Sequence, residues 1–146
     1  MIDPKWIGVE SETRHAQVEA GQLRLFAKAT GETNPIFFDD EAARVGGYPA
    51  LPAPPTFLFG LSLLHAQQRG GIGEMEIDLG KILHGEQDFT YHRMVHAGDS
   101  LRFATRNLDI YQKKGGALEF VEQETLFHNQ DDELCLTART VLVVRH

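Results

Sequence analysis

Residues 53–68 read APPTFLFGLSLLHAQQ, and this stretch decides the fold. Proline at positions 54 and 55 suits the start of a helix, where the missing N–H would have had no partner. The following Arg69-Gly70-Gly71 is typical of a helix end, with a cation in the last turn and then glycine. Between these signals, large apolar residues occur all round the helix until its last turn. A helix of this kind is buried, so we expect it inside the protein.

Four runs of β character follow between Lys81 and the C-terminus, each ended by a turn signal or by the chain end. One sheet curled round one buried helix covers the apolar faces of both. The sequence therefore predicts an α+β protein of hotdog fold, an antiparallel sheet wrapped around a long central helix, in a single domain over residues 1–146. Changes in the apolar alternation predict a bulge near Asn107 and a second register change within residues 117–128.

Composition excludes several classes of protein. The formal charge is −7 with no basic block, which argues against a nucleic-acid partner. The longest apolar stretch is about half of what a bilayer span requires, so we expect no membrane segment. The N-terminus has no cationic flank before an apolar core, and Cys135 is the only cysteine. We expect a soluble cytoplasmic protein without a disulfide, a metal site or a cofactor.

The first third of the chain holds local signals. Trp6 lies in a polar segment that we expect to cover the domain as a strap, with the indole as a packing anchor. Apolar spacing predicts an amphipathic helix over residues 20–30, ended by Gly31. Asp39 is placed to cap a short helix over residues 40–45.

The loop between these two helices reads Gly31-Glu32-Thr33-Asn34-Pro35-Ile36-Phe37. Asn34-Pro35 keeps the backbone out of a helix and fixes a turn. One interpretation is a surface turn. The other is that Glu32 and Asn34 are held rigidly beside the start of the buried helix, where an acyl carbonyl could be polarised.

Three stretches in this order resemble the MaoC-like hydratase/dehydratase family: GETNPIFFDDEAA at residues 31–43, APPTF at 53–57 and HRMVHAGDSLRF at 92–103. The similarity runs from about Gly8 to Val144. The resemblance implies a hotdog fold and thioesters of coenzyme A or acyl carrier protein (acyl-CoA or acyl-ACP) as substrates. It also implies reversible addition of water to a 2-enoyl thioester, giving the (3R)-hydroxy product, and a homodimer or heterodimer formed through edge strands.

The chain departs from the family at two positions. In catalytic members the loop reads Gly-Asp-x-Asn-Pro-x-His, and the Asp and His act as an acid/base pair. Here these positions hold Glu32 and Phe37. Glutamate moves the carboxylate by roughly 1.5 Å, whereas productive geometry tolerates about half an ångström of error. Phenylalanine carries no proton, so position 37 has no acid/base role.

Three functions remain open. The chain is an active hydratase homodimer that uses Glu32 with a histidine from elsewhere, a partner subunit that shapes the acyl channel for a second hotdog chain, or an acyl-thioester binder without catalysis. A hotdog thioesterase ranks lower, because the resemblance would place a carboxylate on or near the central helix and residues 56–68 contain none.

The candidate site combines groups from two places. We expect the thioester oxygen to meet the N–H groups of Thr56 and Phe57, where the helix dipole adds positive potential. In the strand over residues 82–92, alternation places Gln87 toward the helix and His84 away from it, unless Gly85 forms a bulge.

The predicted catalytic residues are therefore Glu32 and His84, and the predicted substrate-binding residues are Asn34, Thr56, Phe57 and Gln87. His92 and His96 are predicted to be exposed.

Overall fold

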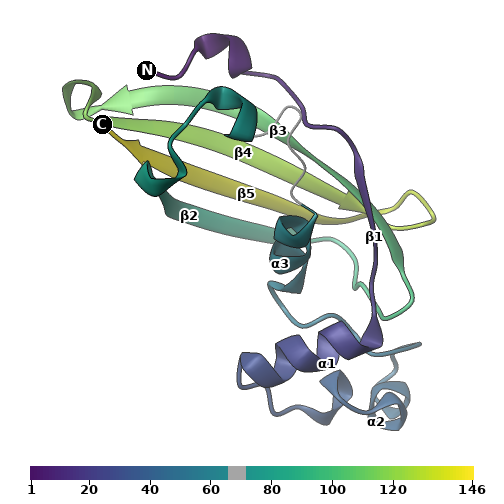
Figure 1. The fold of residues 1–146 in the computed structure, drawn as a ribbon. Helices are drawn as coiled ribbons and strands as arrows, with labels where there is room; N and C mark the ends of the chain where they lie inside the picture. Colours follow the sequence, from purple (N-terminus) through teal and green to yellow (C-terminus); the bar gives the residue numbers. More distant parts are fainter. Residues whose placement is uncertain (66–71) are drawn as a thin grey trace.

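A five-stranded antiparallel sheet forms most of the molecule (Figure 1). The computed structural model describes residues 1–65 and 72–146. The strands lie in the order β1-β3-β4-β5-β2. Their bounds are β1 (Arg14–Gln17), β2 (Ile82–Tyr91), β3 (Ser100–Lys113), β4 (Leu118–His128) and β5 (Leu134–Arg145). The long strands β3, β4 and β5 occupy the middle of the sheet, so β1 and β2 are its two edges.

The helices are short. They are α1 (Ala20–Ala29), α2 (Asp40–Val45) and α3 (Phe57–Leu64), with 3-10 helices η1 (Pro4–Trp6), η2 (Pro35–Phe37), η3 (Ile72–Met75), η4 (Leu79–Lys81) and η5 (Lys114–Gly116). The predicted helices over residues 20–30 and 40–45 are confirmed, and the Asp39 carboxylate caps α2 by accepting from the Ala42 N–H at 2.7 Å. Within the described ranges, no helix has the length and apolar character that a membrane crossing demands.

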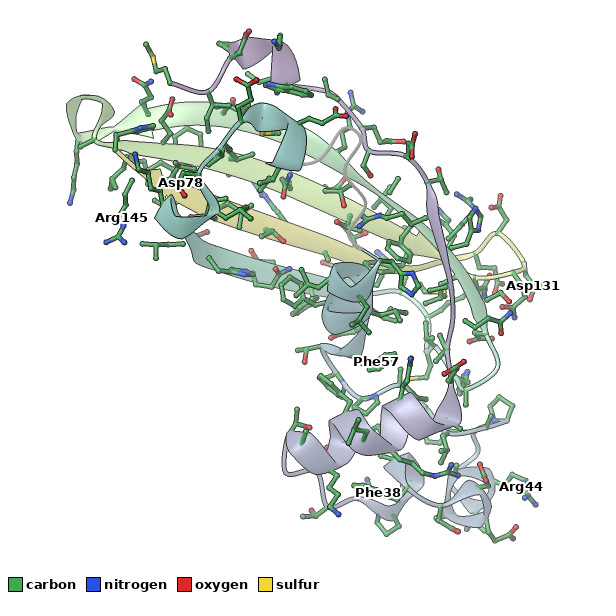
Figure 2. The ribbon with its side chains drawn as sticks, in the orientation of Figure 1. Phe38, Arg44, Phe57, Asp78, Asp131 and Arg145 are labelled. Carbon is green, nitrogen blue, oxygen red and sulfur yellow. The ribbon has the colours of Figure 1, made fainter. Side chains whose placement is uncertain are left out.

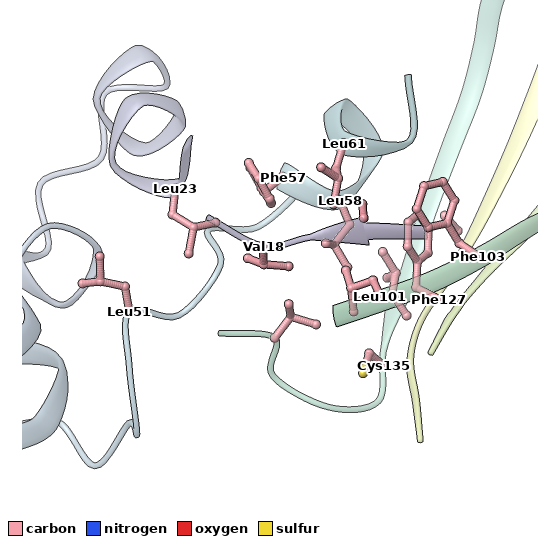
Figure 3. Packing of buried hydrophobic residues seen from close by; sticks show 14 of the residues in the cluster. Val18, Leu23, Leu51, Phe57, Leu58, Leu61, Leu101, Phe103, Phe127 and Cys135 are labelled. Carbon is pink, nitrogen blue, oxygen red and sulfur yellow. The ribbon is translucent and has the colours of Figure 1, made fainter. Parts of the chain in front are cut away.

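The main core joins α3 to the sheet. Phe57, Leu58 and Leu61 of α3 are buried in one cluster with strand residues that include Phe103 and Phe127 (Figure 3). The rings of these two phenylalanines stack at 5.0 Å between centroids. The sheet thus packs its inner face against α3, and the predicted hotdog fold is confirmed.

The prediction of a helix buried on all sides is wrong. Helix α3 begins at Phe57, after Thr56, and its last described turn is open to solvent: Leu63 is 59% exposed and Leu64 74% exposed. The sheet covers one side of α3 and Phe26 of α1 packs edge-on against Phe57 at 5.5 Å between ring centroids, whereas Leu63 and Leu64 stay exposed. The predicted helix end at Arg69-Gly70-Gly71 lies outside the described residues.

A second core lies toward the other end of the sheet and buries Ile2, Met75, Val121 and Val144. Trp6 packs against this cluster and confirms its predicted role as a packing anchor. The N-terminal segment runs alongside β3 before it forms β1 (Figure 1), and the Gly8 and Ser11 N–H groups donate to the carbonyls of Asn107 and Thr105, each at 2.8 Å.

Bulges set which side chains face α3. The predicted bulge near Asn107 is confirmed by a register shift between Asn107 and Asp109. A register shift between His84 and Glu86 places a bulge at Gly85 as well. The predicted second register change within residues 117–128 lies at the end of β4, between Phe127 and His128, and from Leu118 to Phe127 the strand pairs with β5 without interruption.

Candidate functional site

A groove of about 330 Å³ opens beside the start of α3, and we call it the α3 groove. Its walls come from the end of η2, the segment before α3, the end of β2 and the start of β5. They are mainly apolar, and the lining residues are Phe37, Ala53, Pro54, Pro55, Thr56, Leu58, Tyr91, His92, Arg93, Met94, Val95, Cys135 and Leu136. Figure 2 places Phe57 at the start of α3, between the sheet and α1. Concave, mostly apolar surfaces with a few polar groups are typical of ligand sites.

The backbone at the start of α3 is unusual. Thr56 has φ 69° and ψ −7°, a left-handed conformation that is uncommon for a β-branched residue. Its N–H donates to the Tyr91 hydroxyl at 2.9 Å. The Phe57 N–H donates to the Pro54 carbonyl at 3.2 Å. Both donors predicted to hold a thioester oxygen therefore have protein partners in this structure, and a ligand would have to displace them.

Glu32 and Asn34 are held by their own loop. The Glu32 carboxylate accepts from the N–H groups of Thr33 at 2.9 Å and Asn34 at 3.1 Å. The Asn34 side chain accepts from the Ile36 N–H at 3.2 Å and so caps η2. Neither Glu32 nor Asn34 lines the α3 groove. Phe37 is the one residue of this loop that lines the groove, and its side chain has no acid or base group.

The bulge at Gly85 decides where His84 lies. A Cβ atom at Gly85 would come within 2.8 Å of Val143 Cγ2, so glycine allows the close approach of β2 to β5. The bulge resets the alternation and turns His84 toward α3, where its ring contacts Phe59 edge-on at 5.3 Å between centroids. His84 lines a different cavity from the α3 groove.

Gln87 forms hydrogen bonds within the sheet. Its side-chain amide donates to the Arg139 carbonyl at 3.0 Å, and its oxygen accepts from the Thr140 hydroxyl at 2.8 Å. It does not line the α3 groove. The structure therefore brings Thr56 and Phe37 together at one groove and places Glu32, His84 and Gln87 elsewhere.

Tyr91 and His92 line the α3 groove and were not among the predicted site residues. Tyr91 was expected to face the helix, but its contact with the Thr56 N–H depends on a turn that the pattern does not reveal. His92 is exposed, as predicted, yet borders the groove, with Nε2 3.0 Å from the Thr137 hydroxyl.

The prediction that His96 is exposed is wrong. Its side chain is only 19% exposed, and its Nε2 is enclosed without a hydrogen-bond partner. Burial lowers the pKa of His96, although the nearby Asp99 carboxylate acts in the opposite direction. The residue therefore belongs to the packing of the chain, with its ring 6.0 Å from that of Tyr48 between centroids.

Comparison with known proteins places the chain in a family. The FAS1-like, dehydratase domain region matches residues 5–138. A UPF0336 protein from Streptomyces avermitilis is 36% identical over 129 residues, covering 88% of this chain and 85% of the relative. The truncated HadBC (3R-hydroxyacyl-ACP dehydratase) complex from Mycobacterium tuberculosis contains a chain with TM-score 0.78 and 30% identity, covering 94% of this chain and 96% of that one.

The R-hydratase PhaJ1 from Pseudomonas aeruginosa has the same fold, with TM-score 0.73 at 19% identity, covering 96% of this chain and 82% of that one. The fold agrees with the family match over residues 5–138, since an antiparallel sheet packs on α3 and a groove lies beside the start of that helix. The chain belongs to the FAS1-like dehydratase domain region family, with a MaoC-like hotdog fold.

Proposed function

We propose that this chain is the acyl-binding subunit of a two-chain dehydratase that adds water reversibly to a 2-enoyl thioester of coenzyme A or acyl carrier protein. The second chain, another hotdog protein with an Asp and a His in its loop, supplies the acid/base pair. The observation that carries the proposal is Phe37 in the α3 groove, where a protonatable side chain would be needed. The Glu32 carboxylate is engaged by two N–H groups of its own loop and does not reach the groove.

The exposed edge of β2 supports a partner chain. β2 pairs with β5 along one side, and no strand in residues 1–65 or 72–146 pairs with its other side. Leu83 and Tyr91 on this strand are 46% and 54% exposed, and Leu63 and Leu64 of α3 are exposed as well. A bare edge with apolar neighbours is a template for pairing with another strand. The related HadBC dehydratase is also a complex.

In this proposal the chain binds and positions the substrate. The apolar walls of the α3 groove, including Leu58 and Leu136, take the first carbons of the acyl group. The thioester oxygen displaces the Tyr91 hydroxyl from the Thr56 N–H and gains a donor at the positive end of α3.

A second candidate is a hydratase that works without another kind of chain. The observation that favours it is His92 in the wall of the groove, because histidine is the side chain that most often acts as a general acid or base. Glu32 would have to leave its loop partners to take part.

Hydration of crotonyl-CoA separates the two. The chain should be assayed alone and after co-purification with a hotdog chain that carries the Asp/His pair. We expect activity in the complex only, with Glu32→Gln within about twofold of wild type, because acid/base groups contribute about a hundredfold or more. Glu41→Gln is the matched control, since Glu41 is exposed and pairs with Arg44 on α2.

Activity of the chain alone that falls about a hundredfold in Glu32→Gln or His92→Ala would overturn the two-chain proposal and support the second candidate. Thioester binding without activity in either preparation would leave a binding protein only.

A further inference from the structure

A second cavity lies between α3 and the inner face of the sheet, and we call it the inner cavity. Its volume is about 250 Å³. Phe59 and Ser62 line it from α3, and Thr105, Thr125 and Thr140 line it from the middle strands. The inner cavity and the α3 groove share none of the residues that line them.

The inner cavity is more polar than the interior of a sheet normally is. Three threonines from three adjacent strands face it, where aliphatic residues would form a dry core. The hydroxyls of Thr105 and Thr125 lie 2.8 Å apart, and that of Thr140 donates to Gln87. A carboxylate accepts hydrogen bonds and donates none, so only a free hydroxyl proton can bond it. Thr140 already donates its proton to Gln87, whereas the Thr105–Thr125 pair uses one of its two protons and keeps the other for a ligand. An all-carbon chain would leave that donor unused.

A charged residue stands in the same wall. Arg14 of β1 donates from Nη1 to the Ser62 carbonyl at 3.3 Å and from Nη2 to the Thr105 hydroxyl at 2.9 Å. Its guanidinium lies 4.7 Å from the centroid of the Phe103 ring. The Nε atom is enclosed and has no hydrogen-bond partner.

The charge of Arg14 is not matched by an anion. Among residues 1–65 and 72–146, no carboxylate pairs with it, and burial lowers its pKa. The carbonyl at the end of α3 offsets part of the charge, since a helix C-terminus carries about half a negative charge. If Arg14 served only to cap the C-terminus of α3, no cavity with three hydroxyls would be needed beside it.

We propose that the inner cavity binds the carboxylate of a small organic acid, with Arg14 as the pairing charge and the hydroxyls of Thr105, Thr125 and Thr140 as the polar lining. His84 and Gln123 complete the wall. The carboxylate has two possible sources, a free short-chain acid or the far end of an acyl chain. The proposal of a carboxylate site does not depend on the proposed dehydratase function; only the second source does.

Calorimetric titration with butyrate and with butyramide tests the site, because the two probes have similar shape and differ in charge. We expect butyrate to bind at least tenfold more tightly than butyramide, and Arg14→Met to lose that preference. Arg102→Met is the matched control, since Arg102 pairs with Asp132 at the β4–β5 hairpin. Equal binding of the two probes, no binding of butyrate, or unchanged preference in Arg14→Met would overturn the proposal.

Arg14 also supports the end of α3, so circular dichroism must show that Arg14→Met folds. If it does not fold, Thr125→Val decides the matter. We expect at least a threefold loss of butyrate affinity in Thr125→Val, and unchanged affinity would overturn the proposal.

Model thioesters identify the source of the carboxylate. The succinyl and butyryl thioesters of N-acetylcysteamine differ at the far end of the acyl chain, where the first carries a carboxylate. Tighter binding of the succinyl thioester that is lost in Arg14→Met supports the end of an acyl chain as the source. Equal binding of both thioesters beside retained butyrate binding supports a free acid. Failure of both thioesters with retained butyrate binding would count against the proposed dehydratase function and not against the carboxylate site.

Discussion

Substitution of Gly85 by alanine should lower the free energy of unfolding, and the distances around Gly85 give the size of the loss. The new Cβ would lie 2.8 Å from Val143 Cγ2 and 3.1 Å from the Val141 carbonyl oxygen. Carbon atoms normally meet at about 3.5–4.0 Å, so β2 or β5 must move by several tenths of an ångström. Overpacking of this kind costs about 1–3 kcal/mol. With a urea slope of about 2 kcal/mol/M, the unfolding midpoint should fall by roughly 1 M.

The double variant Gly85→Ala/Val143→Ala tests the cause. It removes Cγ2 but leaves the contact with the Val141 oxygen, so we expect it to be more stable than the sum of the single changes by at least about 0.5 kcal/mol. Gly21→Ala is the control: apart from its chain neighbours and the nearby backbone of α1, no atom lies within 4 Å of the added Cβ, and the change should stabilise by up to about 1 kcal/mol. A midpoint of Gly85→Ala equal to that of wild type, or strict additivity with Val143→Ala, would refute the reasoning.

Three further changes can be read by urea unfolding. Glu119 is 1% exposed and accepts from Gln112 and the Ile2 N–H. Burial alone would raise the pKa of Glu119, but these hydrogen bonds outweigh burial and lower it. Glu119→Gln should therefore lower the free energy of unfolding by about 1–3 kcal/mol at pH 7, and this loss should shrink as the pH falls below the ordinary carboxyl pKa toward the lowered one; a loss that is the same at every pH would contradict this. Tyr91→Phe should cost about 1 kcal/mol through the lost bond to the Thr56 N–H. Thr56→Gly should stabilise by up to about 1 kcal/mol, because glycine relieves the left-handed strain.

Local patterns predicted much of the fold. The spacing of Leu23 and Ala27, both fully buried, marked α1 correctly. The change of apolar alternation near Asn107 marked a real bulge. These signals succeed because each depends on which face of one element is buried, and that is written within a dozen residues.

The pattern failed where the burial of a side chain depends on distant partners. On β4, Phe120 stacks on Tyr111 at 5.0 Å between centroids, with Lys113 over the ring, whereas its neighbour Glu119 is buried. The buried carboxylate is satisfied by the Ile2 N–H, which is 117 residues away in the chain. Hydrophobic alternation cannot anticipate a polar group that is buried because remote donors satisfy it.

The candidate site was less predictable than the fold for the same reason. The family resemblance located the loop and the start of α3, and Phe37 and Thr56 do line one groove. The sequence alone did not decide which face of β2 carries His84, because this depends on a bulge at Gly85. Glycine allows the bulge, since a Cβ atom there would meet Val141 and Val143 of β5. Arg14 was missed because β1 is a four-residue edge strand with one buried residue.

Helix α3 differs from its predicted burial in its last described turn. Sequence reasoning expected every apolar residue of the helix to be buried, and it is right for Phe57 and Leu61 and wrong for Leu63 and Leu64. Both leucines lie in the last described turn of α3, where the helix is open to solvent. In the two-chain proposal this surface and the bare edge of β2 meet the second hotdog chain, and apolar residues that are exposed in one chain are typical of such a surface. If the protein is monomeric at micromolar concentration alone and stays unpaired when mixed with a hotdog chain carrying the Asp/His pair, this interpretation fails.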